Sequence, residues 1–138
     1  MEHTIELEPG GRWVNIRYAG PVSLESLKAL HDRMVASRWW QPGLPRLFDY
    51  ESASISEIGF LEAADNLLPY LDGRRERLFG PGPVTQVHVC SDPLKAVMLQ
   101  YWIRLAETRL PVRNRLFDRR LEAEDWLVEQ FQGAFEPA

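Results

Sequence analysis

The sequence predicts an α/β fold: a five-stranded, mostly parallel sheet with an antiparallel N-terminal hairpin and four helices. Two observations carry this prediction. Strand-like residues 84–90 lead into a capped amphipathic segment, and strand-like residues 112–117 lead into another. Because parallel strands need crossover connections, usually helices, this alternation indicates a parallel sheet. A chain of 138 residues is of ordinary size for one domain, so we expect a single domain over residues 1–138.

The N-terminal part of the chain predicts a hairpin and the first crossover. Residues 4–7 and 13–18 have strand character, and Pro9-Gly10-Gly11 is a turn signal between them. Ser23 is a favourable helix N-cap, and apolar residues then recur at helical spacing. Residues 44–50 are expected to form the third strand.

The middle of the chain predicts a second helix and then a long irregular segment. An apolar stripe runs from Phe60 to Leu71, but Pro69 lacks an N–H, so we expect a kink or the end of this helix within residues 65–68. Residues 72–83 are rich in glycine, proline and arginine and are predicted to be irregular.

The C-terminal part predicts two strand–helix units. After the strand at 84–90, Asp92-Pro93 fits a helix start. The stripe that this helix is expected to bury comprises Leu94, Val97, Met98, Tyr101, Trp102 and Leu105. Residues 112–117 form the last predicted strand, and a helix carrying Trp126 and Leu127 follows. The predicted order is strand–strand–helix–strand–helix–strand–helix–strand–helix, with right-handed crossovers.

Composition narrows the function classes. The net charge of −4 gives no general affinity for nucleic acid. The chain contains one cysteine, so no intrachain disulfide forms, and no apolar run approaches the about 18 residues that span a bilayer. We therefore expect a cytoplasmic protein without a membrane span. The histidines at 3, 31 and 88 lack metal-ligand spacing, so no metal or other cofactor is expected.

Three stretches of the sequence, in this order of elements, resemble a known family. They are Ile-Arg-Tyr-Ala-Gly-Pro-Val-Ser at residues 16–23, the strand end at Phe48-Asp49, and Val-Arg-Asn-Arg-Leu-Phe-Asp at residues 112–118, which leads to Trp126-Leu127. Over roughly residues 12–127 the chain resembles the STAS domain, the anti-sigma-factor-antagonist family. The resemblance is greatest to its SpoIIAA-like subgroup, whose fold is shared with CRAL-TRIO lipid-binding domains.

The resemblance implies a non-enzymatic regulatory module that binds a protein partner. The family's switch is a serine, phosphorylated by a partner kinase, in a turn that opens the second helix. Alignment of the family's glycine with Gly59 places Glu57 on that serine, and a permanent carboxylate cannot be toggled. We therefore expect the chain to act without this phosphoserine switch; the alternative is a small shift of register in which Ser52, Ser54 or Ser56 serves instead. The predicted interaction turn comprises Asp49, Ser52, Ser54, Ser56, Glu57 and Gly59.

Other residues leave two interpretations open. One interpretation is a surface for a partner, a phosphate or an anionic lipid headgroup, formed by Trp39, Trp40, Arg74, Arg75 and Arg77. The other is that the tryptophans are buried under the loop and the arginines belong to a solvated face. Cys90 precedes a helix start, where a thiol pKa can fall, or is a small core residue.

The alternatives to a regulatory module are a carrier of a lipid or small apolar ligand and, more remotely, an enzyme that uses the Cys90 thiol. A symmetric homodimer, formed through an apolar helix face or the hairpin, is a further hypothesis.

Overall fold

A computed structural model describes residues 3–55 and 57–131 of the chain; for residues 57–61 and 63 it describes the backbone alone. Five strands form one sheet in the spatial order β1-β2-β3-β4-β5. β1 and β2 pair antiparallel, and the other neighbours pair parallel, which confirms the predicted sheet. The strands are β1 (Thr4–Leu7), β2 (Val14–Pro21), β3 (Arg46–Ser54), β4 (Val84–Val89) and β5 (Val112–Phe117).

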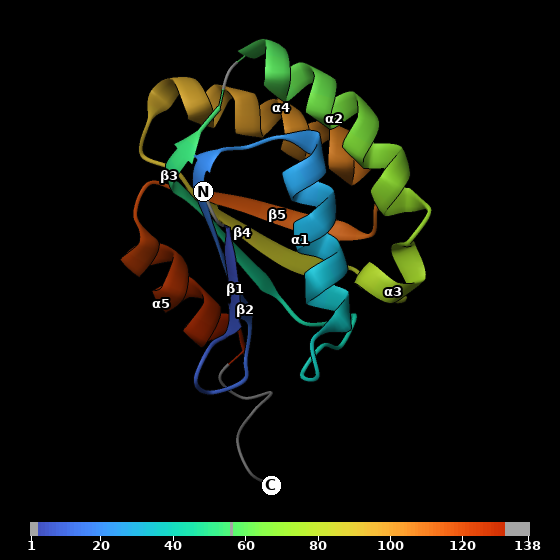
Figure 1. Cartoon of the computed structure of the whole chain (residues 1–138). Coiled ribbons are helices and arrows are strands. Elements are labelled where there is room, and N and C mark those ends of the chain that lie inside the picture. The colour runs from blue at the N-terminus through green and yellow to red at the C-terminus, as the bar shows by residue number, and fades with distance from the viewer. Residues whose placement is uncertain (1–2, 56, 132–138) are drawn as a thin grey trace, which may run out of the picture.

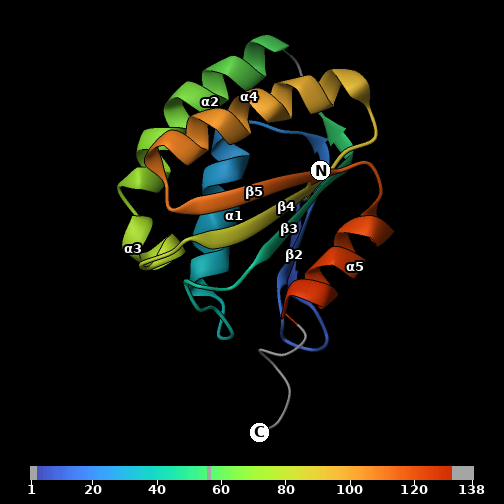
Figure 2. The same cartoon turned by 180° about the vertical axis from the view of Figure 1, so that it is seen from behind.

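The helices cover the two faces of the sheet unequally. They are α1 (Leu24–Ala36), α2 (Glu57–Asp72), α3 (Arg75–Phe79), α4 (Pro93–Arg109) and α5 (Arg120–Phe131). In Figures 1 and 2, α1 to α4 lie on one side of the sheet and α5 lies on the other. None of the helices in the described part of the chain is both long and apolar enough to cross a membrane.

The core consists of two clusters, one on each face of the sheet. The larger lies under α1, α2 and α4, and its sheet residues include Ile16, Phe48 and Val84. The smaller lies under α5 and contains Leu47, Val87 and Leu127, among others. Successive residues of a strand point to opposite faces, so β3 and β4 supply side chains to both clusters. This burial on both faces accounts for adjacent buried residues such as Leu47 and Phe48, which belong to different clusters.

The first crossover begins as the sequence predicts. The Ser23 hydroxyl accepts a hydrogen bond from the Ser26 amide at 3.1 Å, and the Ser26 hydroxyl accepts one from the Ser23 amide at 3.0 Å. This reciprocal cap satisfies two amides that have no partner within the helix. It fixes the start of α1, whose buried residues are Leu27, Leu30, His31 and Met34.

Of the two alternatives predicted from Pro69, a kink or the end of the second helix, the helix end is wrong. α2 continues through Pro69 to Asp72. Leu67, Leu68 and Leu71, on both sides of the proline, are each at most 5% exposed. Burial of three leucines contributes about 1.5–3 kcal/mol each, which exceeds the about 3 kcal/mol cost of an interior proline.

The segment predicted to be irregular contains a fifth helix, which corrects the predicted number of four. The short helix α3 buries Leu78 and Phe79 against the core, and so these two apolar side chains anchor the connection. Gly82 follows with φ of +60°, and a Cβ at this position would lie 2.6 Å from the Pro111 Cβ. A glycine is therefore required where this connection passes the start of β5.

Candidate interaction site

The predicted interaction turn lies at the carboxyl edge of the sheet, where β3 leads into α2. Ser52 and Ser54 are exposed but belong to β3 itself, where they pair with Ala19 and Pro21 of β2. The strand thus ends four residues later than the predicted 44–50, because β2 continues alongside it. Ser56 lies outside the described residues, and so does the side chain of Glu57; the backbone of Gly59 belongs to α2.

The end of β3 is tied to the start of α4 by polar contacts that sequence reasoning missed. The Glu51 carboxylate accepts hydrogen bonds from the Ser91 amide and the Ser91 hydroxyl, both at 2.9 Å. The Lys95 ammonium donates to the Ala53 carbonyl at 2.6 Å. These contacts join residues about 40 positions apart. A local sequence pattern therefore does not predict them. They make the carboxyl edge and the first turns of α4 one continuous surface.

An apolar face of α4 is exposed on this surface. Leu94 is 72% exposed, Val97 64% and Tyr101 46%. Their spacing places them on one side of the helix. These residues belong to the stripe predicted to face the core, so that part of the prediction is wrong. Leu99 and Ala106 are the buried residues of α4.

The phase of α4 is set by its cap and its neighbours. The Asp92 carboxylate accepts hydrogen bonds from the Leu94 and Lys95 amides and fixes the first turn. α4 packs against β5 and α2. Trp102 and Leu105, which also belong to the predicted stripe, contact the core from a partly buried position. The helix is apolar on two sides, and the packing buries only one of them.

Asp49 is buried on the α5 side of the sheet and does not face the interaction turn. Its carboxylate lies 2.9 Å from the Arg120 guanidinium and 3.9 Å from that of Arg17, and it accepts a hydrogen bond from the Glu51 amide. Only 4% of the residue is exposed. This arrangement points to a structural role, in which Asp49 fastens α5 to the sheet.

Cys90 and the histidines lie in the core. Cys90 is 1% exposed, and burial raises the pKa of its thiol. This environment disfavours the thiolate that a reactive cysteine needs. Burial lowers the pKa of both His31 and His88 to about 4. Within residues 3–55 and 57–131, no cluster of three or more potential metal ligands occurs.

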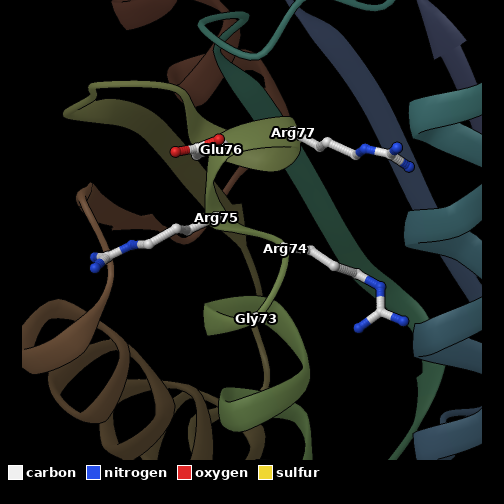
Figure 3. Close-up of a pocket in the computed structure, with 5 residues that line it drawn as sticks. All are labelled: Gly73, Arg74, Arg75, Glu76 and Arg77. Atoms are coloured by element: carbon white, nitrogen blue, oxygen red, sulfur yellow. The ribbon is translucent and has the colours of Figure 1, made fainter.

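The structure brings together only some of the tryptophans and arginines that were predicted to form a surface. Trp40 is half-buried, and its indole N–H donates to the Arg77 carbonyl at 2.9 Å. Trp39, also half-buried, packs against the core. Arg74 and Arg77 point to the same side, toward α1, whereas Arg75 points away from them (Figure 3). The Arg75 guanidinium lies 3.6 Å from the carboxylate of Asp72, the last residue of α2.

The cavity between the sheet and the helices is small. It has a volume of about 30 Å³ and is lined by residues that include Tyr18, His31, Gln86 and Trp102. This is the space of about one water molecule.

The sequence matches no protein-family model and no curated protein. Among solved structures, it is similar to an uncharacterized DUF3478-family protein with a SpoIIAA-like fold from Shewanella loihica PV-4. The identity is 17% and the TM-score 0.57, over 91% of this chain and 92% of that one. It is also similar to the anti-sigma factor antagonist SpoIIAA in its unphosphorylated form. Here the identity is 12% and the TM-score 0.53, over 96% and 99% of the two chains. The chain therefore has the SpoIIAA-like fold that the resemblance predicts.

Proposed function

For a chain with a SpoIIAA-like fold, we propose a function as a non-enzymatic regulatory module that binds a partner protein through α4 and the adjoining carboxyl edge of the sheet. The exposed apolar face formed by Leu94, Val97 and Tyr101 carries this proposal. Large apolar side chains gathered on one exposed helix face are typical of surfaces that bind other proteins.

The polar surroundings of this face support a specific interface. Protein interfaces combine an apolar centre with a polar rim. Here Ser52, Ser54 and Lys95 lie next to the apolar face, and the Glu51–Ser91 contacts hold the β3 end in place. A surface that is already ordered loses little conformational entropy on binding. One of the similar solved structures is an anti-sigma factor antagonist, a name that describes action against another protein.

The absence of a switchable serine at position 57 is part of the proposal. Glu57 carries a permanent negative charge where the family resemblance places the phosphorylated serine. Regulation is then expected to depend on the amount of the chain and its partner rather than on phosphorylation of this residue.

The cavity volume favours this function over a lipid carrier. Drug-sized ligands occupy pockets of about 300–1,000 Å³, whereas the space between sheet and helices is about 30 Å³. A carrier would have to displace several core side chains to admit a lipid between the sheet and the helices.

Site-specific photo-crosslinking tests the proposed interface. A photoreactive amino acid is introduced at position 97 of the full chain in its native host, and adducts are identified by mass spectrometry. Position 121 is the matched control, because Leu121 is 68% exposed but belongs to α5 on the other face of the sheet. We expect a defined protein adduct from position 97, its loss in the Leu94→Glu variant, and no such adduct from position 121.

Two results would contradict the proposal. One is the same set of adducts from positions 97 and 121, and the other is no adduct from position 97 at all. An adduct with twice the mass of the chain would identify the partner as a second copy, and light scattering of the purified protein would then show a dimer that Leu94→Glu dissociates.

A further inference from the structure

A groove between α1 and the α2–α3 junction lies apart from the proposed protein interface. Asp32, Val35 and Ala36 of α1 form one wall, and Arg74 and Arg77 form the other. Its volume is about 380 Å³. The same two arginines also line a shallow hollow of about 600 Å³, together with Gly73, Arg75 and Glu76 (Figure 3). This space falls within the usual range for a small-ligand site.

The groove carries an excess of positive charge although the whole chain is acidic. The Arg74 guanidinium lies 3.7 Å from the centre of the Tyr70 ring, and Lys28 approaches the same ring at 5.1 Å. None of the described residues pairs with the side chain of Arg77. The opposing charge is Asp32, whose carboxylate accepts a hydrogen bond from the Tyr70 hydroxyl. Among the residues that line the groove, two arginines and one aspartate leave a formal charge of +1, and Lys28 adds a further positive charge nearby.

The two arginines are held in place while their donors stay available. Stacking on Tyr70 and a hydrogen bond to the Tyr70 carbonyl at 3.3 Å orient Arg74. The bond from the Trp40 indole to the Arg77 carbonyl fixes the backbone beneath the second guanidinium. By contrast, the neighbouring Arg75 already contacts Asp72 and donates to the Arg109 carbonyl at 2.9 Å. The donors of Arg74 and Arg77 are therefore the ones that can recognise an anion.

The charge and shape of the groove select a class of ligand. Guanidinium groups bind phosphate through paired N–H donors. A phosphate monoester carries a charge of about −1.5 to −2 at neutral pH, which is opposite in sign to the net charge of the groove. The side chains of Val35 and Ala36 add an apolar wall beside the arginines. We propose that this groove binds a phosphate monoester with an apolar body.

Isothermal titration calorimetry with phenyl phosphate tests the proposal. We expect the wild-type chain to bind phenyl phosphate more tightly than inorganic phosphate, because the apolar wall contacts only the ester. The double variant R74Q/R77Q should weaken binding by at least about tenfold. The matched control R75Q removes the same type of charge from the same segment and should leave the affinity unchanged. Asp32→Asn should strengthen binding by up to about fivefold, because it removes the opposing charge.

Three results would overturn the proposal: no heat of binding for either probe, equal affinities for phenyl phosphate and inorganic phosphate, or equal losses in R75Q and R74Q/R77Q. Circular dichroism of each variant verifies that the fold is retained, and Asp32→Asn supplies a change of opposite sign that unfolding cannot produce.

A second arm of the experiment identifies the source of the phosphate. Co-sedimentation with phosphatidylcholine vesicles that contain phosphatidic acid is measured for wild type, R74Q/R77Q and R75Q. Co-sedimentation that is lost only in R74Q/R77Q assigns the groove to a lipid headgroup. Calorimetric binding of phenyl phosphate without co-sedimentation assigns it to a soluble ester.

Discussion

Lowering the pH from 7 to about 5 should reduce the free energy of unfolding by about 4 kcal/mol through His31 and His88. Burial lowers the pKa of each from 6.5 to about 4 in the folded chain. Between these two pKa values the histidines are protonated in the unfolded chain and neutral in the folded chain. The free energy of unfolding therefore falls as the pH falls. The linkage relation gives about 2 kcal/mol for each histidine at about pH 5.

The hydrogen bonds of His88 explain why its neutral form is preferred. The Asn114 side-chain oxygen lies 2.8 Å from Nε2 and can only accept, so Nε2 carries the hydrogen. Nδ1 of the neutral ring then accepts from the Tyr50 hydroxyl at 3.1 Å. A proton on Nδ1 would remove this acceptor and place a charge in the core. His31 donates from Nδ1 to the Leu27 carbonyl at 2.8 Å and is also buried.

Urea denaturation at pH 7 and at about pH 5 measures the effect. His31→Gln and His88→Gln are each expected to lower stability at pH 7. Each should also reduce the difference between the two pH values by about 2 kcal/mol. That difference does not depend on how stable each variant is. A double variant that keeps the full pH dependence of the wild type would refute the assignment of the effect to these two side chains.

Two further predictions concern Asp49 and Cys90. Arg120→Ala should lower the free energy of unfolding by about 2–3 kcal/mol, because it leaves the buried Asp49 carboxylate with the Glu51 amide and a single guanidinium, that of Arg17 at 3.9 Å. A loss below about 0.5 kcal/mol in urea denaturation would show that the pair is unimportant. The Cys90 thiol should react with iodoacetamide at least about tenfold more slowly in the folded chain than in urea, because it is buried and its pKa is raised. A folded-state rate equal to that of a free thiol would show that Cys90 is accessible and reactive.

The strands were predictable because their signal is local. Residues 112–117 were predicted as a strand and form β5, and residues 84–90 were predicted where β4 covers Val84–Val89. In both cases β-branched or apolar residues follow a turn and precede a helix cap. The hairpin was predictable from Pro9-Gly10-Gly11 for the same reason.

The candidate sites were less predictable because they depend on contacts between distant residues. The arginine-rich segment at 74–77 was recognisable from the sequence. Its arginines differ in their partners: Arg75 pairs with Asp72, whereas Arg74 stacks on Tyr70. Arg74 and Arg77 line the groove beside α1, and only the structure shows this. Nothing near Glu51 in the sequence indicates that its carboxylate binds Ser91.

The alternation of strands and helices, and with it the SpoIIAA-like fold, was therefore contained in the sequence, because hydrophobic period and capping act over a few residues. Which face of α4 is buried was decided only by tertiary packing. Its residues are apolar on two sides, and contact with β5 and α2 selects the side of Leu99 and Ala106. Leu94, Val97 and Tyr101 remain exposed as a result. Burial of a side chain depends on the element that packs against it. The sequence of α4 alone does not specify that β5 and α2 are the elements that pack against it.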